Sequence, residues 1–312
     1  MNKILVTGAN GFVGSSLCDT LCRRGMDFVP VVRKADLNGQ ISVGDLGPDT
    51  DWTAALDGCD VVIHLAARVH VMNDSASDPL AAFRAVNVDA TLNLARQALA
   101  KGVKRFVFVS SIKVNGEETT NQAFTAFDEP APIDPYGQSK LEAEIALQEL
   151  GNVTGLEVVI VRPPLVYGPG VRANFRRLMQ LVKIGVPLPL GAIHNRRSMV
   201  AVDNLVDLLV LCASHPAAAG QVFMVSDDHD VSISELLRLL AAAMGKRSML
   251  LALPAGLIAG AAAVLGKSAV ASRLLGSLQV DINHTKSTLQ WQPPVSMEFA
   301  LKKTVAAYRA HS

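Results

Sequence analysis

The N-terminal stretch Lys3-Ile4-Leu5-Val6-Thr7-Gly8-Ala9-Asn10-Gly11-Phe12-Val13-Gly14 decides the fold. Its short apolar run predicts a buried strand, and the apolar spacing after the glycines predicts a helix. A strand, a glycine turn and a helix in this order form a site for a dinucleotide pyrophosphate, because the helix N-terminus faces the negative charge. We assign Gly8 to the tight turn, Gly11 to close approach of the phosphates, and Gly14 to helix–strand packing. Glycines alone can also serve a purely structural turn. The flanking strand and helix are what favour a nucleotide-binding site here.

The composition excludes several classes of protein. A chain of 312 residues can form one large domain or two modest ones. Lys plus Arg number 29 and Asp plus Glu number 28, so no basic excess is available for binding nucleic acid. The 4 cysteines lack metal-ligand spacing, which predicts no metal site and a reduced, cytoplasmic protein. The apolar run at the N-terminus is too short for a signal peptide.

The stretch most like a membrane segment is 250–265, which is rich in Ala, Leu and Gly. Pro254, Gly256 and Gly260 interrupt it, and it is shorter than the roughly 20 apolar residues that a span needs. We therefore expect no membrane span. The segment is interpreted as a buried or interfacial helix, with docking on a membrane surface as the alternative.

Strand and helix patterns alternate through the first half of the chain. Strands are expected at 28–32, 41–46, 59–65, 106–109 and 156–161, and helices from Asp78-Pro79 to about Ala100 and from Asp134-Pro135 to about Gly151. This alternation predicts an α/β fold with a Rossmann-type doubly wound parallel sheet. Beyond Arg162-Pro163-Pro164 the pattern becomes irregular and mainly helical. We expect a dinucleotide-binding domain over 1–165 and a smaller substrate-binding lobe over 166–312, with some of its segments returning to the first domain.

The end of the second expected strand bears on the choice of cofactor. Arg33 and Lys34 stand there, and no acidic residue occurs before Asp36. An acidic side chain at this position would bind the ribose 2′-hydroxyl of NAD, whereas an arginine suits the extra phosphate of NADP. Among the NAD(P)(H) cofactors we favour NADP(H). The alternative is that both basic residues only solvate the strand end.

Tyr136, Lys140 and Ser111 are candidates for proton transfer. Tyr136 and Lys140 lie four residues apart in a helix and so share one face. A free tyrosine has a pKa of about 10, and a nearby ammonium favours the phenolate, so the pair can shuttle a proton. Ser111 follows a neighbouring strand and can hold a substrate oxygen while hydride moves at the attached carbon. For His64 we favour a hydrogen-bonded core histidine over a catalytic one.

Together these residues resemble the extended short-chain dehydrogenase/reductase family, in its nucleotide-sugar branch of NAD-dependent epimerases and dehydratases. Residues 7–14 match T-G-x-x-G-x-x-G, residues 64–67 match H-x-A-A, and residues 135–140 match P-Y-x-x-S-K. Residues 110–116 resemble S-S-x-x-V-Y-G, with Asn115 in place of the usual tyrosine. The resemblance extends over nearly the whole chain.

The resemblance implies roles for individual residues. Tyr136 would be the catalytic acid/base, Lys140 would bind the nicotinamide ribose, and Ser111 would hold the substrate oxygen. Cofactor-binding residues would be Gly8, Asn10, Gly11, Phe12, Val13, Gly14, Arg33, Asp45, Leu46, Leu65, Ala66, Ala67, Asn87, Tyr136, Lys140 and Pro163. Substrate-binding residues would be Ser111, Tyr136, Asn174 and Arg197, with the Arg197 guanidinium on the diphosphate of a UDP-sugar. The family also implies a homodimer formed by the helices near 80–100 and 135–150.

The residues after Ser111 limit the range of reactions that the enzyme could catalyse. The 4,6-dehydratases carry Asp and Glu at these positions to eliminate water, and Ile112 and Lys113 cannot do so. Residues 110–117 look most like bacterial polysaccharide enzymes that reduce UDP-4-keto-6-deoxy-N-acetylhexosamines, so a 4-ketoreductase is our first interpretation. A UDP-hexose 4-epimerase, which removes and returns hydride in one cofactor cycle, is the second. A reductase of hydrophobic carbonyls and a non-catalytic NADP-binding sensor are further alternatives.

Overall fold

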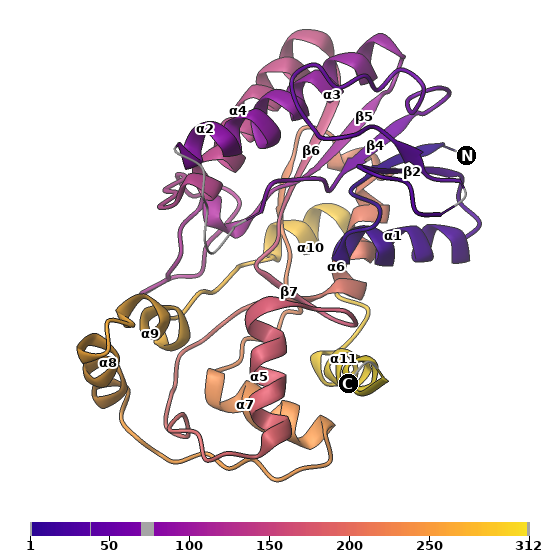
Figure 1. Cartoon of the computed structure of the whole chain (residues 1–312). Helices are drawn as coiled ribbons and strands as arrows, with labels where there is room; N and C mark the ends of the chain where they lie inside the picture. Colours follow the sequence, from indigo (N-terminus) through magenta and orange to yellow (C-terminus); the bar gives the residue numbers. More distant parts are fainter. Residues whose placement is uncertain (1, 38, 70–77, 311–312) are drawn as a thin grey trace.

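The computed structural model describes residues 2–37, 39–69 and 78–310, and it shows a helix-covered sheet joined to a smaller lobe (Figure 1). The sheet is parallel and has the strand order β3-β2-β1-β4-β5-β6-β9. Its strands are β1 (Ile4–Thr7), β2 (Phe28–Val32), β3 (Ile41–Ser42), β4 (Val61–His64), β5 (Arg105–Val109), β6 (Glu157–Arg162) and β9 (Val222–Met224). The predicted Rossmann-type doubly wound sheet is therefore confirmed.

Helices cover both faces of the sheet. One face carries α1 (Phe12–Arg23), α6 (Val202–Cys212) and α10 (Asn283–Leu289), and the other carries α2 (Pro79–Arg84), α3 (Ala90–Ala100) and α4 (Pro135–Thr154). Within β1, Ile4 and Val6 belong to the first core and Leu5 to the second. This alternation follows from the two-residue period of a strand, and burial on both faces explains why Ile4, Leu5 and Val6 are all apolar.

Two helices begin at the Asp-Pro pairs that the sequence indicates. The side chains of Asp78 and Asp134 accept hydrogen bonds from the backbone amides of Ala81 and Gly137, at 3.0 and 2.7 Å. The helix expected to run unbroken to Ala100 is instead divided. A π-helical turn, η1 (Ala85–Asp89), separates α2 from α3, and such widened turns often occur at functional sites.

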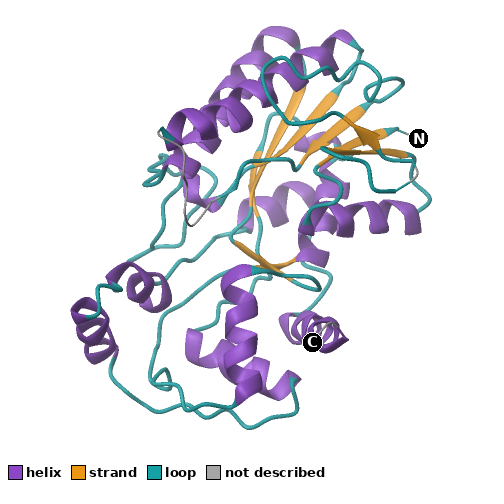
Figure 2. Cartoon of the chain, viewed as in Figure 1, coloured by secondary structure: helices purple, strands orange, loops and turns teal. Residues whose placement is uncertain are grey.

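The smaller lobe is built mostly from helices (Figure 2). A two-stranded parallel sheet of β7 (Leu165–Tyr167) and β8 (Met199–Ala201) packs with α5 (Ala173–Ile184), α7 (Ile233–Ala243) and α11 (Met297–Ala310) around a third core. The lobe also carries α8 (Ala255–Val264) and α9 (Ser268–Leu275). The chain beyond residue 166 supplies α6, β9 and α10 to the larger sheet and its helical layer.

The helix α8 is not buried, so this part of our interpretation of 250–265 is wrong. None of its residues is buried, although Ile258 packs against the edge of the third core. Pro254 precedes this helix of 10 residues, and Gly266 turns the chain in the left-handed region after it. Among the helices of the described ranges, none is both long and apolar enough to cross a membrane.

Candidate active site

The glycine turn after β1 leaves backbone exposed where a dinucleotide would lie. Gly8 has a φ of +65°, and a Cβ there would lie 3.0 Å from the Ala66 amide nitrogen. A Cβ on Gly14 would lie 2.1 Å from the Gly8 carbonyl oxygen, so only glycine fits. α1 begins after Gly11 without a side-chain cap, which leaves the amides of its first turn for an anion. The turn therefore fits a pyrophosphate group.

His64 joins this turn to the next strand as a neutral, buried side chain. Its Nδ1 lies 2.8 Å from the Thr7 hydroxyl and its Nε2 lies 3.0 Å from the Thr91 hydroxyl. The Thr7 hydroxyl accepts from the amides of Leu65 and Ala66, so it donates its proton to Nδ1 of His64, which places the imidazole proton on Nε2. Burial, aided by the nearby Lys140 charge, lowers the His64 pKa to about 3. The core-histidine interpretation is confirmed.

Ser111 and Tyr136 come together from different elements. Ser111 ends the loop after β5 and caps η2 (Ile112–Val114), where its Oγ accepts from the Lys113 amide at 3.2 Å. A hydrogen bond with Ser111 lowers the Tyr136 pKa, but burial and the Asp134 charge outweigh it and raise that pKa to about 12. Tyr136 as a whole is partly exposed, so the raised pKa reflects burial around its hydroxyl.

Lys140 lies one helical turn from Tyr136 and is 2 % exposed. Its ammonium is 3.9 Å from the centre of the Phe108 ring, and within the described residues it makes no hydrogen bond or ion pair. Burial lowers the Lys140 pKa to about 7, against the opposing effect of Glu144. The sequence-based expectation that Lys140 depresses the Tyr136 pKa is therefore wrong for this arrangement, because desolvation dominates both groups.

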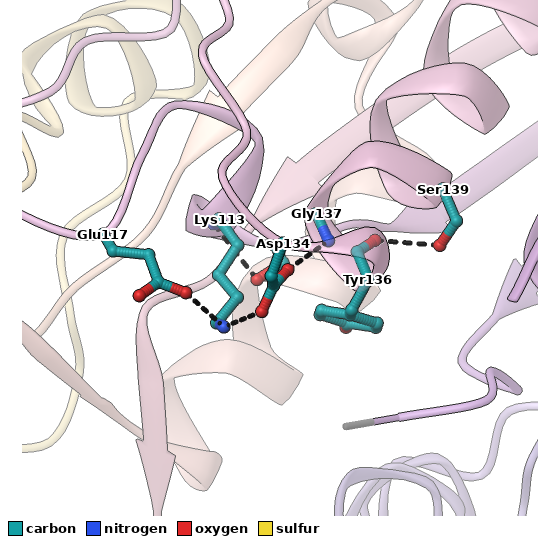
Figure 3. Close-up of polar contacts among 7 residues, drawn as sticks. Lys113, Glu117, Asp134, Tyr136, Gly137 and Ser139 are labelled. Carbon is teal, nitrogen blue, oxygen red and sulfur yellow. Dashed lines mark hydrogen bonds and ion pairs between the residues drawn. The ribbon is translucent and has the colours of Figure 1, made fainter. Parts of the chain in front are cut away.

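A charged cluster lies beside Tyr136, and the sequence analysis did not predict it. The Lys113 ammonium lies between the carboxylates of Glu117, at 2.7 Å, and Asp134 (Figure 3). Asp134 also caps the helix that carries Tyr136. The i, i+4 spacing of Lys113 and Glu117 is visible in the sequence, but nothing local indicates Asp134 as the second partner.

Asn115 has a structural role that explains the departure from the family motif. Its side-chain oxygen accepts from Arg162 at 3.0 Å, and its amide donates to the Thr125 carbonyl at 3.1 Å. Arg162 in turn forms a buried ion pair with Glu144 on α4. This network links the loop after Ser111 to β6 and α4, the helix of Tyr136.

The π-helical turn η1 brings Asn87 to the same helix. The Asn87 amide donates to the Ser139 hydroxyl at 2.9 Å and to the Arg68 carbonyl at 3.1 Å, and its oxygen accepts from the Arg68 amide. Ser139 follows Tyr136 by three residues and donates to its carbonyl. Asn87 thus braces the start of α4, close to the proposed cofactor site, as well as the chain after β4.

The remaining candidate cofactor residues lie around the carboxyl ends of the strands. Arg33, after β2, is exposed and lies 3.7 Å from the exposed Asp45 carboxylate, a surface contact of little energetic value. The Pro163 carbonyl accepts from the Ile112 amide, which ties it to the Ser111 loop. Asn10 is exposed, whereas the side chains of Phe12, Val13, Leu46, Leu65, Ala66 and Ala67 are partly buried.

The two substrate candidates of the smaller lobe lie apart from this cluster of contacts. Asn174 is exposed in the first turn of α5. Arg197 lies before β8, and its Nη1 donates to the carbonyls of Arg273 and Gly276, both at 2.9 Å. Burial lowers the Arg197 pKa. Arg197 therefore holds the end of α9.

The parallel sheet, its glycine turn and the Ser111, Tyr136 and Lys140 group define an extended short-chain dehydrogenase/reductase. The chain belongs to the NAD dependent epimerase/dehydratase family, whose sequence profile matches residues 4–226. A Vibrio cholerae protein named UDP-glucose 4-epimerase is 48% identical to it, with 98% of this chain and 95% of the relative covered.

Two further comparisons support the same family. An Escherichia coli O157:H7 protein is named N-acetyl-alpha-D-glucosaminyl-diphospho-ditrans,octacis-undecaprenol 4-epimerase. It is 30% identical, with 83% of this chain and 78% of the relative covered. The solved structure of MoeE5 in complex with UDP-glucose and NAD matches with a TM-score of 0.79 and 26% identity, covering 99% of each chain.

Proposed function

We propose that this enzyme is an NAD(P)-dependent 4-epimerase of UDP-hexoses. The observation that carries the proposal is the hydrogen bond of Ser111 with Tyr136, together with Ile112 and Lys113 in place of the two carboxylates that would eliminate water. The Vibrio cholerae relative, similar over nearly the whole chain, bears the name of this activity. Epimerase therefore ranks above the 4-ketoreductase that residues 110–117 suggested first.

The side chains supply proton transfer at the C4 hydroxyl. Tyr136 takes the hydroxyl proton as C4 is oxidised and returns it when C4 is reduced from the opposite face. The Ser111 oxygen accepts from the Lys113 amide, which orients the hydroxyl, and substrate binding would turn its proton from Tyr136 to the C4 oxygen. Lys140, one helical turn along α4, would bind the ribose of the cofactor. The cofactor, when bound, supplies the acceptor and donor of the C4 hydride.

A 4-ketoreductase is the second candidate, and one observation favours it. The end of β2 carries Arg33 and no carboxylate, and the exposed Arg33 guanidinium suits a 2′-phosphate better than a 2′-hydroxyl. An NADPH-consuming reductase would use that preference. The choice of NADP over NAD, the homodimer and the cytoplasmic location all remain predictions.

The two candidates differ in whether the cofactor is consumed. The purified enzyme is incubated with UDP-glucose or UDP-N-acetylglucosamine and catalytic NAD, without reductant, and the C4 epimers are separated by chromatography. We expect interconversion, and a loss of roughly 10²–10⁴-fold for Tyr136→Phe with cofactor binding retained. No interconversion, together with stoichiometric oxidation of NADPH by a UDP-4-keto-6-deoxy-N-acetylhexosamine, would establish the reductase.

The same assay also tests which carrier group is attached to the sugar through the diphosphate. The Escherichia coli relative is named for a sugar carried on polyprenyl diphosphate rather than on UDP. A short-chain polyprenyl diphosphate N-acetylglucosamine is therefore included beside the UDP-sugars. Turnover of the lipid-linked sugar but not of the UDP-sugars would support epimerisation at C4. It would also show that the sugar is carried on polyprenyl diphosphate instead of UDP.

A further inference from the structure

The helix α8 is apolar around its whole circumference and lacks the cover that such a helix needs. Its ten residues contain no charged or hydroxyl side chain, and none of them is buried. A helix that is hydrophobic on every side is normally enclosed in a core or by a membrane. The described part of the chain does not enclose α8, which leaves its outer surface unpartnered.

The apolar surface extends beyond α8 itself. Seven large apolar side chains of this stretch are exposed: Met249, Leu251, Leu253, Leu257, Val264, Leu265 and Val270. Figure 1 shows α8 and α9 side by side at one edge of the smaller lobe, on the opposite side from α11. We call these seven residues the α8 face. An exposed group of large apolar side chains of this kind marks an interaction site.

The charges around the α8 face have one sign. Between residues 236 and 280 the chain has five basic residues and no carboxylate, although the whole chain has a net charge of only +1. Lys246 and Arg247 precede the face, and Lys267 and Arg273 follow α8; all four are exposed. An apolar surface bordered by cations complements the anionic headgroups and the acyl boundary of a bilayer.

We propose that the α8 face docks the enzyme onto the surface of an anionic phospholipid bilayer. The helix has 10 residues, about 15 Å at 1.5 Å per residue, so it would lie in the interface rather than cross it. A second copy of the chain fits less well, because a two-fold interface would bring the cations around the two faces together.

Docking would place the substrate side of the enzyme near the membrane. The segment before α8 is held by Leu188, whose carbonyl accepts from the Leu251 amide at 2.8 Å. The end of α9 is held by Arg197 and by Asn195, which donates to the Gly276 carbonyl at 2.8 Å. Arg197, our candidate diphosphate ligand, therefore contacts the helix that packs against α8. The docking itself does not depend on the proposed reaction.

Vesicle flotation tests the docking with the full-length protein. Vesicles of phosphatidylcholine alone are compared with vesicles of phosphatidylcholine and phosphatidylglycerol at 7:3. We expect the wild type to float with the anionic vesicles and at least tenfold less with the neutral ones. Leu257→Asp/Val264→Asp should abolish flotation, because it puts two carboxylates on the apolar face. Arg247→Glu/Lys267→Glu should lower the bound fraction at least about 20-fold, at roughly fivefold for each cation lost.

Matched controls distinguish a specific role of the α8 face from general effects of adding a charge to the surface. Phe299→Asp changes an exposed apolar residue of α11 in the same lobe and should float like the wild type. All variants should keep the soluble activity, because none changes a site residue. Absence of wild-type flotation on anionic vesicles, or unchanged flotation of Leu257→Asp/Val264→Asp, would overturn the proposal. A wild-type oligomer dissolved by that variant, without flotation, would identify the face as a protein interface instead.

Discussion

Lys113 is ion-paired with Asp134, the residue that caps the helix carrying Tyr136. Lys113 lies in the turn that follows Ser111, so this contact joins the segments that carry Ser111 and Tyr136, the two hydroxyls that we propose act in catalysis. It also balances the Asp134 charge, which by itself raises the Tyr136 pKa. The pair therefore affects both the geometry of the site and the pH at which Tyr136 can act.

Substitutions of this pair should shift the pH dependence in opposite directions. Asp134→Asn removes the negative charge and lowers the Tyr136 pKa, while asparagine still caps the helix. Lys113→Met removes the ammonium that pairs with Asp134 and raises the Tyr136 pKa further. The rise of kcat/KM with pH should therefore move to lower pH in Asp134→Asn and to higher pH in Lys113→Met. Shifts in the same direction would contradict this electrostatic account.

The neighbouring serines Ser110 and Ser111 provide a matched pair. Ser111 bonds with Tyr136, whereas the buried Ser110 hydroxyl has no hydrogen-bond partner among the described residues. Ser111→Ala should lower kcat about 10²-fold or more, since it removes a donor at the developing oxyanion. Ser110→Ala should leave kcat unchanged within a factor of about two. Equal losses in the two variants would show that the segment, rather than the Ser111 hydroxyl, matters.

Gly14 should not tolerate a side chain. An added Cβ would meet the Gly8 carbonyl at 2.1 Å, so Gly14→Ala must displace α1 from the turn. We expect a lower melting temperature, with a cost of about 1–3 kcal/mol, and weaker binding of NAD and NADP in fluorescence titration. Gly260→Ala, in α8 where the space is open, is the control and should stabilise the fold by up to about 1 kcal/mol. Unchanged cofactor affinity in Gly14→Ala would exclude the turn as the pyrophosphate site.

The buried pair of Arg162 and Glu144 should show strong coupling. The closest approach is 2.5 Å, and both side chains are almost wholly buried. Glu144→Leu leaves the guanidinium with Asn115 as its one side-chain partner among the described residues and should cost about 3–5 kcal/mol in urea unfolding. Arg162→Met/Glu144→Leu should recover most of that loss. Additive losses in the double variant would show that the two charges do not stabilise each other.

Arg197 distinguishes a diphosphate substrate from a hydrophobic carbonyl. If its guanidinium binds the diphosphate, Arg197→Ala should raise the KM for a UDP-sugar at least about tenfold, as expected for losing a charged hydrogen bond. Arg196→Ala removes the adjacent exposed cation and is the control. Thermal unfolding of both variants reports any loosening of α9. An unchanged KM in a folded Arg197→Ala variant would favour a substrate without a diphosphate.

The sequence allowed prediction of those features that depend on neighbouring residues. The glycine turn, the two Asp-Pro helix starts and the alternating strands have local signals. The Lys113–Asp134 pair and the network of Asn115, Arg162 and Glu144 join distant segments and have none. The division at η1 was missed because the apolar pattern continues across it. The exposure of α8 was also hidden, because apolar composition does not show which surface covers a helix.

The path of the C4 hydrogen tests the central claim most directly. UDP-glucose and UDP-N-acetylglucosamine deuterated at C4 are incubated with the enzyme in ordinary water without added reductant, and the C4 epimers are examined by mass spectrometry and NMR. The account predicts epimers that keep deuterium at C4, because the same hydride leaves and returns within one site. Products carrying protium at C4, or no epimer from either sugar, would contradict it.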